Sequence, residues 1–240
     1  RRIYCLHLMA LLSVQIKKHG GKYTLALSKE YSATMMPAGA KGTPNHAEKV
    51  MKYYSIATGD SSAEISLLEG NSGLKVVYYN QGDAAWKSIP YSTSTIGQSG
   101  CGPTSMAICI STLSGKKITP RQTCQWAGSQ GYYVKGAGSK HDVIPGLAKK
   151  YGVKCKGVGK NKPQIIQALK TGKLVVAIMS AGHFTSGGHF IVLTGIKDGK
   201  ITVADCGSRQ RTKQTWSLDL IVNESNSSAS AGGPFWIISK

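Results

Sequence analysis

A single cysteine stands between two glycines in the stretch SGCGPTS, residues 99–105. The residues that follow have helical spacing, and four of them predict one apolar face: Met106, Cys109, Ile110 and Leu113. Cys101 lies at the predicted helix start and off that face. The unpaired N–H groups and the positive dipole end of a helix N-terminus stabilise an anion and lower the pKa of a thiol. The pattern therefore indicates a nucleophilic thiolate at Cys101, while Cys109 is expected to be an inert core thiol.

A thiolate nucleophile needs a base, and usually a third group that holds the base in one tautomer. His183 and His189 both lie in the stretch SAGHFTSGGHFIVLTG. We favour His189, because it opens a strongly apolar predicted strand and a base must be held by a rigid element. His183 lies in a looser, glycine-rich segment and is the alternative base.

The third candidate is Asp205, at the end of the next predicted strand. Residues 198–199 are an Asp-Gly pair, which is a strong hairpin signal. Uninterrupted pairing from that turn would set Asp205 opposite Val192, on the sheet face away from His189. A bulge, or a bend at residues 206–207, is therefore required if Asp205 is to orient His189.

An acyl-transfer site also needs hydrogen-bond donors for the oxyanion. The backbone N–H of Cys101 can supply one, and a glutamine side chain can supply the second. Gln98 is so near the nucleophile that its loop would have to turn it inward, whereas Gln81 follows a predicted strand that could hold it beside the helix. The residues alone leave both glutamines open.

These residues must be positioned by helices that lie between the first predicted strand and a later run of strands. Helices are predicted from residue 101 and over 120–130, 141–152 and 163–172, and strands over 75–79, 173–180, 188–196, 200–207 and 234–239. This order predicts an α+β fold with helices packed on an antiparallel sheet. We expect residues 71–240 to form one domain and residues 1–70 to be an accessory region of unknown role.

The chain of 240 residues has a net charge of +19, and residues 71–240 carry +15 of it. From Lys149 to Lys173 the sequence has eight lysines and no acid. Such a run is either a solvated face or a surface that attracts a polyanion, such as nucleic acid, anionic lipid or an acidic cell-wall polymer. Zinc-finger spacing, a basic region with heptads and an aromatic ribonucleoprotein motif are all missing, which argues against specific nucleic-acid binding.

The six cysteines include no C-x-x-C pair, which argues against a structural zinc site. Whether Cys5, Cys124 and Cys155 form disulfides is open. The first residues combine two arginines with an apolar run of about 12 residues, which is too short to span a bilayer. No small-residue cleavage site follows that run, so we expect a core helix there instead of a signal peptide.

The order NQGDAAW, SGCGPTSMA, GGHFIVLTG and ITVADCG resembles the double-glycine peptidase-like cysteine peptidases, relatives of the bacteriocin-leader-processing proteases. The resemblance covers about residues 75–240 and implies a papain-like fold. Position by position, it implies Cys101 as nucleophile, His189 as base, Asp205 as orienting acid and Gln81 as oxyanion donor. The spacing between Gln81 and Cys101 is longer than in the leader peptidases. The chemistry requires no cofactor.

The sequence thus predicts a cysteine peptidase that cleaves extracellular or cell-envelope peptides. The stand-alone members that it resembles are secreted or envelope-associated, bacterial or phage-borne. The lysines from Lys149 to Lys173 would then bind an anionic cell-wall polymer. Leader cleavage coupled to export is not expected, because neither a long apolar span nor a Walker motif is seen. The alternatives are an inactive papain-like binding module and a basic protein that binds nucleic acid through charge.

Overall fold

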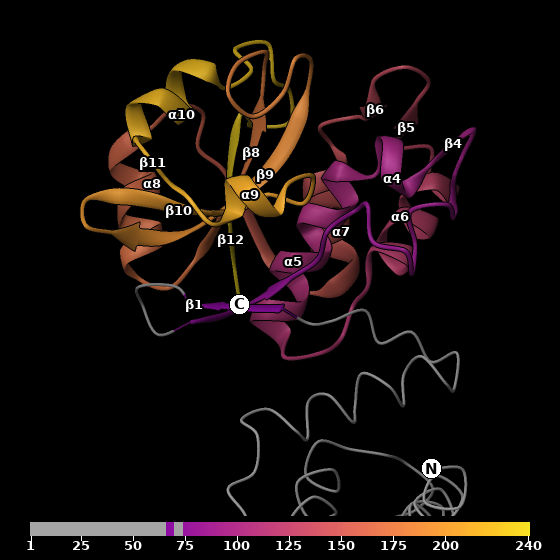
Figure 1. The fold of residues 1–240 in the computed structure, drawn as a ribbon, viewed down its shortest axis with the longest axis horizontal. Coiled ribbons are helices and arrows are strands. Elements are labelled where there is room, and N and C mark those ends of the chain that lie inside the picture. Colours follow the sequence, from indigo (N-terminus) through magenta and orange to yellow (C-terminus); the bar gives the residue numbers. More distant parts are fainter. Residues whose placement is uncertain (1–65, 70–73) are drawn as a thin grey trace, which may run out of the picture. The chain divides into compact units, whose positions relative to one another are not determined.

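The computed structural model of the chain describes residues 66–69 and 74–240, and Figure 1 shows their arrangement. The strands are β1 (Ser66–Glu69), β2 (Lys75–Tyr78), β3 (Pro90–Tyr91), β4 (Ser94–Thr95), β5 (Tyr133–Val134), β6 (Gly138–Ser139), β7 (Lys154–Gly157), β8 (Leu174–Met179), β9 (His189–Lys197), β10 (Lys200–Ala204), β11 (Thr215–Trp216) and β12 (Phe235–Ser239). The helices are α4 (Ile96–Ser99), α5 (Cys101–Ser114), α6 (Pro120–Ser129), α7 (Val143–Tyr151), α8 (Lys162–Lys170), α9 (Arg209–Thr212) and α10 (Leu218–Glu224).

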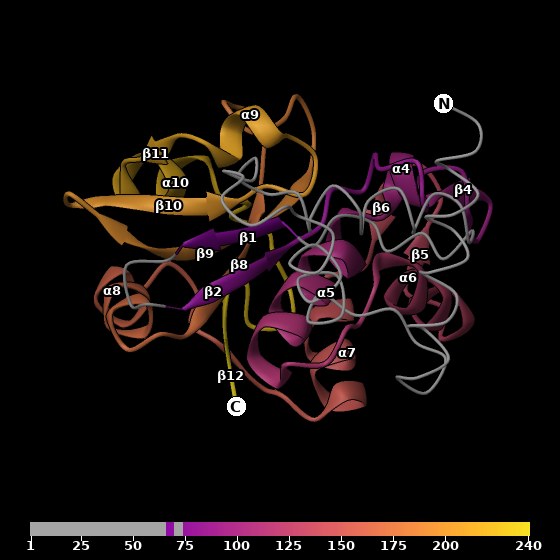
Figure 2. The same ribbon diagram turned by 60° about the horizontal axis from the view of Figure 1, so that its bottom comes forward.

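The main sheet has six strands in the order β11-β10-β9-β8-β12-β7, and every neighbouring pair is antiparallel. Every residue of β8, with the sequence LVVAIM, is buried. A strand reads as a continuous apolar run when both faces of its sheet are covered. Figures 1 and 2 show this covering: α8 and α10 lie on one side of the sheet and α5, α6 and α7 on the other.

Each covered face has its own core. On one face, side chains of α8 and α10 pack against β8 and β9 in a cluster that includes Ile165, Leu169, Val175, Leu193 and Ile221. On the opposite face, β9 packs against α5 so closely that a Cβ added at Gly102 would lie 3.3 Å from the Phe190 ring. The start of α5 is thereby fixed beside the start of β9, where His189 lies.

Helix α5 is buried on more than the predicted apolar face. Met106, Cys109, Ile110 and Leu113 are buried as predicted, but so are Thr104, Ser105, Ala107 and Ile108. The helix contacts α6, α7, β2 and β9, so it is a central helix instead of an amphipathic surface helix. The helical spacing of the four apolar residues identified one buried face of this helix. It could not show that the other faces are covered as well.

The hairpin of β9 and β10 forms around Asp198 and Gly199 as predicted. Both residues have positive φ angles, 49° and 74°, as a two-residue type I′ turn requires. Lys200 pairs with Lys197, which is the register that the sequence predicted.

The register of this hairpin then shifts by one residue between Thr202 and Val203, and Thr194 is the extra residue on β9. After this bulge Ala204 pairs with Val192, so the next residue, Asp205, is in step with Ile191. Residues two apart on a strand share a face, and Asp205 is therefore on the same face as His189. The bulge that the sequence analysis required is present.

The α+β fold with helices on an antiparallel sheet is confirmed. The described residues belong to one unit, Ile65–Lys240. The predicted accessory region 1–70, with its expected N-terminal helix, lies outside the described residues apart from β1, and its boundary stays a prediction. Within 66–69 and 74–240, the helices are too short or too polar to cross a membrane.

Candidate active site

Cys101 is the first residue of α5 and is partly exposed. A Cβ at Gly100 would lie 2.6 Å from the Ile96 carbonyl oxygen and 3.1 Å from Cys124 Sγ. The glycine is therefore required by the protein's own packing. Gly102, on the other side of Cys101, packs in the same way against the Phe190 ring.

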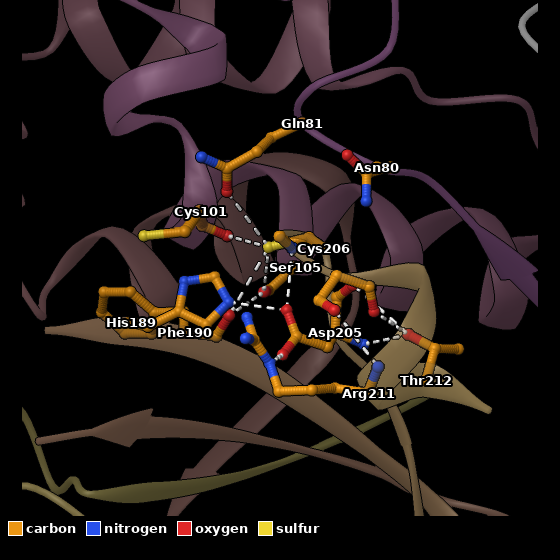
Figure 3. Close-up of polar contacts among 12 residues, drawn as sticks. Asn80, Gln81, Cys101, Ser105, His189, Phe190, Asp205, Cys206, Arg211 and Thr212 are labelled. Carbon is orange, nitrogen blue, oxygen red and sulfur yellow. Dashed lines mark hydrogen bonds and ion pairs between the residues drawn. The ribbon is translucent and has the colours of Figure 1, made fainter. Parts of the chain in front are cut away.

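His189 begins β9 and is only 7% exposed. Its Nε2 lies 2.7 Å from Asp205 Oδ1, so the N–H at Nε2 donates a hydrogen bond to this carboxylate. Nδ1 is then the nitrogen left for Cys101, and Figure 3 shows the His189 ring between Cys101 and Asp205. Burial lowers the pKa of His189, but hydrogen bonds and charge interactions with Asp205 and Cys101 outweigh it and raise the pKa to about 9.

Asp205 is fully buried and ionised. Its Oδ1 accepts hydrogen bonds from His189 and, at 2.8 Å, from the backbone N–H of Gly207, and its Oδ2 accepts one from Arg211 Nε at 2.5 Å. Burial raises the pKa of this carboxyl, but the interactions with His189 and Arg211 outweigh that effect and hold the pKa below its ordinary value. The carboxylate is therefore a fixed negative partner for the histidine ring.

The thiol of Cys101 has a lowered pKa. Burial raises it, but a hydrogen bond and charge interaction with His189 lower it more, and backbone hydrogen bonds of Phe190 and Gly102 add to the lowering. The other described cysteines behave oppositely: burial raises the pKa of Cys155 to about 11 and also raises those of Cys109, Cys124 and Cys206. All five are free thiols. Cys101 is thus the described cysteine whose surroundings favour a thiolate.

The two candidate glutamines lie in different surroundings. The backbone N–H of Gln81 donates to the Cys206 carbonyl oxygen at 2.8 Å, and its Nε2 donates to the Gly97 carbonyl oxygen at 2.8 Å. Figure 3 shows this buried side chain beside Cys101. Gln98, in contrast, is exposed and accepts a hydrogen bond from Ser94 Oγ. The structure brings Gln81 to the site and leaves Gln98 outside it.

The alternative base, His183, is exposed and pairs with Glu224 through its Nδ1. Its backbone N–H also donates to Glu224 Oε2 at 2.8 Å, which ties the loop before β9 to α10. His183 is therefore engaged with a different carboxylate from the one that faces His189.

Two residues that the sequence did not indicate as catalytic contact the site. Cys206 Sγ lies 3.5 Å from Gln81 Oε1, from the Cys101 carbonyl oxygen and from the Phe190 carbonyl oxygen, so it touches the segments that carry three candidates. Arg211 was not considered at all. Ser208 followed by a polar turn is a helix-start signal that could have placed Arg211 within one turn of Asp205.

No group of three or more His, Cys, Asp or Glu side chains that could hold a metal ion occurs within the described ranges. The arrangement is instead a thiol, an imidazole and a carboxylate in sequence, with a side-chain amide next to the thiol. Such a set can perform nucleophilic attack on an acyl group and return a proton to the leaving group.

The α+β fold and this site define a papain-like cysteine peptidase. The model of the Peptidase_C39 like family matches residues 73–231, and the chain belongs to that family. It is accordingly a cysteine peptidase, a hydrolase that acts on peptides. A comparison with curated proteins gave no match.

Among solved structures, the chain is similar to a Bacillus anthracis protein assigned as a C39-like peptidase. The two sequences are 17% identical, the TM-score is 0.46, and the alignment covers 71% of this chain and 96% of that one. At such values the family membership rests on the family model.

Proposed function

We propose that the protein cleaves peptide bonds through Cys101, His189 and Asp205. The observation that carries the proposal is the chain of contacts in which Asp205 binds Nε2 of His189 and leaves Nδ1 for Cys101. This arrangement stabilises a thiolate next to an imidazolium before any substrate binds. The four other described thiols lack such a partner and have raised pKa values.

In the proposed reaction the Cys101 thiolate attacks the peptide carbonyl carbon, and the carbonyl π electrons move to the oxygen. The backbone N–H of Cys101 and the Nε2–H₂ of Gln81 donate to that oxyanion; one Nε2 proton is used by Gly97, and an amide nitrogen has two. The His189 imidazolium gives its Nδ1 proton to the leaving amine. Water, deprotonated by His189, then hydrolyses the thioester and releases Cys101.

A peptide-library digest tests this proposal. We expect the protein to cleave a subset of peptides, Cys101→Ala to abolish cleavage, and Cys155→Ala, which alters a half-buried thiol elsewhere, to leave it unchanged. Cleavage that survives Cys101→Ala contradicts the proposal. No cleavage by the wild type, together with alkylation of Cys101 no faster than that of Cys155, favours the inactive binding module. Peptide ligation in place of cleavage would identify acyl transfer as the reaction.

We further propose that the peptidase acts outside the cytoplasm, secreted or associated with a bacterial envelope, and binds an anionic wall polymer. The support is charge. A hollow of about 410 Å³ is lined by Lys154, Lys156 and Lys173, with no acid among its lining residues. None of the three has an acidic partner in the described part of the chain.

Sedimentation with purified cell walls tests the polymer proposal. We expect salt-sensitive binding that Lys154→Glu with Lys156→Glu weakens and that Lys116→Glu with Lys117→Glu, at exposed positions outside the hollow, leaves nearly unchanged. Equal loss in the two double variants would show that net charge, not this hollow, is responsible. Cell fractionation of a native host tests the localisation.

A further inference from the structure

The carboxylate of Asp205 has two oxygens with different positive partners. Oδ1 faces the His189 ring, at 2.7 Å from Nε2, and Oδ2 faces the guanidinium of Arg211, at 2.5 Å from Nε. Asp205 is fully buried, and the Arg211 side chain is 29% exposed. In Figure 3 dashed lines join both the His189 ring and the Arg211 guanidinium to the Asp205 carboxylate. A single buried carboxylate is thus shared between the imidazole and a permanent cation.

The backbone holds Arg211 at this place. Helix α9 has only four residues, but its start is capped because Ser208 Oγ accepts from the Arg211 N–H at 3.1 Å. Thr212 Oγ1 accepts from the Asp205 N–H at 3.0 Å, which closes the loop between β10 and α9. Trp216 Nε1 donates to the Arg211 carbonyl oxygen at 3.2 Å. The segment after β10 therefore folds back onto the carboxylate that precedes it.

We propose that Arg211 is a positioning residue of the peptidase: its guanidinium fixes the outer oxygen of Asp205 and limits how strongly that carboxylate attracts the His189 imidazolium. The proposal rests on the proposed function of Cys101 and His189 and deepens it. The two tasks are separate. The hydrogen bond from Arg211 Nε fixes the rotation of the carboxylate, and the guanidinium charge sets how strongly that carboxylate attracts the imidazolium.

The direction of the electrostatic effect follows from charge. A buried carboxylate whose single counterion is the imidazolium would stabilise it fully, and a cation on the far oxygen offsets part of that attraction. Without Arg211 the imidazolium becomes more stable, the pKa of His189 rises, and His189 becomes a poorer acid toward the leaving amine. With Arg211, the fully buried Asp205 stays ionised while the histidine can still release its proton.

Other titratable or charged groups face this pair from the elements packed around it. They are Tyr78, whose hydroxyl donates to the Asp205 carbonyl oxygen at 2.8 Å, Cys101, Cys206, and Arg209. The pKa values of Tyr78 and Cys206 are raised by burial, so both are neutral at working pH. Cys101 is already part of the ion pair. Arg209 is the other cation near the pair.

Arg209 provides a matched control. It lies on the same short helix, carries the same charge, and pairs with Asp83 at 2.6 Å while its guanidinium lies 5.8 Å above the Tyr78 ring. Removing either arginine changes the net charge by one unit, but Arg211 is the one in contact with Asp205. A difference between the two variants therefore reports the contact and not the net charge.

The test is an NMR titration of the His189 ring, assigned by its loss in His189→Gln. We expect Arg211→Gln, which can still donate to Asp205, to raise the His189 pKa by about one unit. Arg211→Lys should stay within about half a unit of the wild type because it keeps the charge, and Arg209→Gln should leave the pKa in place. The lysine variant tests the proposal even if the glutamine variant folds poorly.

An unmoved or lowered His189 pKa in Arg211→Gln overturns the proposal, as does an Arg211→Lys shift of a full unit upward or an equal shift in Arg209→Gln. Alkylation of Cys101 in the same samples separates this failure from that of the proposed function. If wild-type Cys101 reacts faster than Cys155 and the titration shows no Arg211 effect, this inference alone fails. If wild-type Cys101 is no faster, both fail.

Discussion

Exchange of Asp205 for Asn removes the charge that orients His189 while nearly keeping the side-chain shape. The pKa of His189 is about 9 against an ordinary 6.5. One pKa unit corresponds to about 1.4 kcal/mol, so the surroundings stabilise the imidazolium by about 3 kcal/mol net of burial. Asp205 and Cys101 share this stabilisation. The two partners also offset the burial penalty, so an equal share for Asp205 is at least about 1.5 kcal/mol, and the exchange should lower the His189 pKa by at least about one unit.

The assay is the pH dependence of Cys101 alkylation by iodoacetate, followed by mass spectrometry. An anionic reagent reacts best while the imidazolium is present, so the alkaline limb of the profile reports the His189 pKa. We expect that limb near pH 9 in the wild type and at least about one unit lower in Asp205→Asn.

Asp219→Asn is the control, because Asp219 also forms an ion pair, with Lys162 at 2.6 Å, but is exposed on α10. This variant should follow the wild-type profile. An alkaline limb that stays in place in Asp205→Asn would refute the reasoning, and so would an equal displacement in Asp219→Asn.

Three further outcomes are expected. Gly207→Ala should slow peptide cleavage by about tenfold or more, because its Cβ would lie 3.0 Å from the His189 ring. Gly187→Ala, which has open space around it, should leave the rate unchanged, and equal rates in the two variants would contradict this expectation. Gln81→Ala should lower kcat by about 10² and Gln98→Ala should have little effect, with thiol alkylation unchanged in both; a reversed order would contradict the assignment. The pKa of Asp205 is lowered in the folded protein, so its contribution to stability is present above pH 3.8 and is lost as the pH falls through the folded-state pKa. Urea unfolding should therefore show that the difference in unfolding free energy between the wild type and Asp205→Asn shrinks below pH 3.8. A difference that stays constant with pH would count against this expectation.

The sequence was sufficient for features that depend on local pattern. Helical spacing after Cys101 placed it at a helix start, and the glycines before His189 placed that residue at a strand start. The Asp-Gly pair at 198–199 predicted both the hairpin and its register. Each of these features is determined by neighbouring residues in the sequence, and tertiary packing stabilises the local structure that those residues favour.

Features set by long-range packing could not be predicted. The need for a bulge followed from the register, but its place, with Thr194 as the extra residue, depends on contacts across the sheet; the hydroxyls of Thr194 and Thr202 hydrogen-bond there at 2.9 Å. The burial of α5 on several faces likewise depends on elements far away in the chain. Arg211 was not identified because α9, the helix of four residues after β10, leaves almost no periodicity to detect.

The choice between Gln81 and Gln98 shows the boundary between the two kinds of feature. Both glutamines precede Cys101 in the sequence, and the residues alone could not separate them. The separation comes from Cys206, whose carbonyl oxygen and thiol hold the backbone and side chain of Gln81 from more than a hundred positions away.

The central claim is that His189 keeps Cys101 as a thiolate. The most direct measurement is an ultraviolet titration of thiolate absorbance, taken as the difference between wild type and Cys101→Ser. We expect the Cys101 thiolate to persist below pH 9.0, the ordinary pKa of a cysteine thiol. In His189→Gln the thiolate should be lost in that range. A wild-type Cys101 that titrates at or above 9.0, or one that His189→Gln leaves unchanged, would contradict the account.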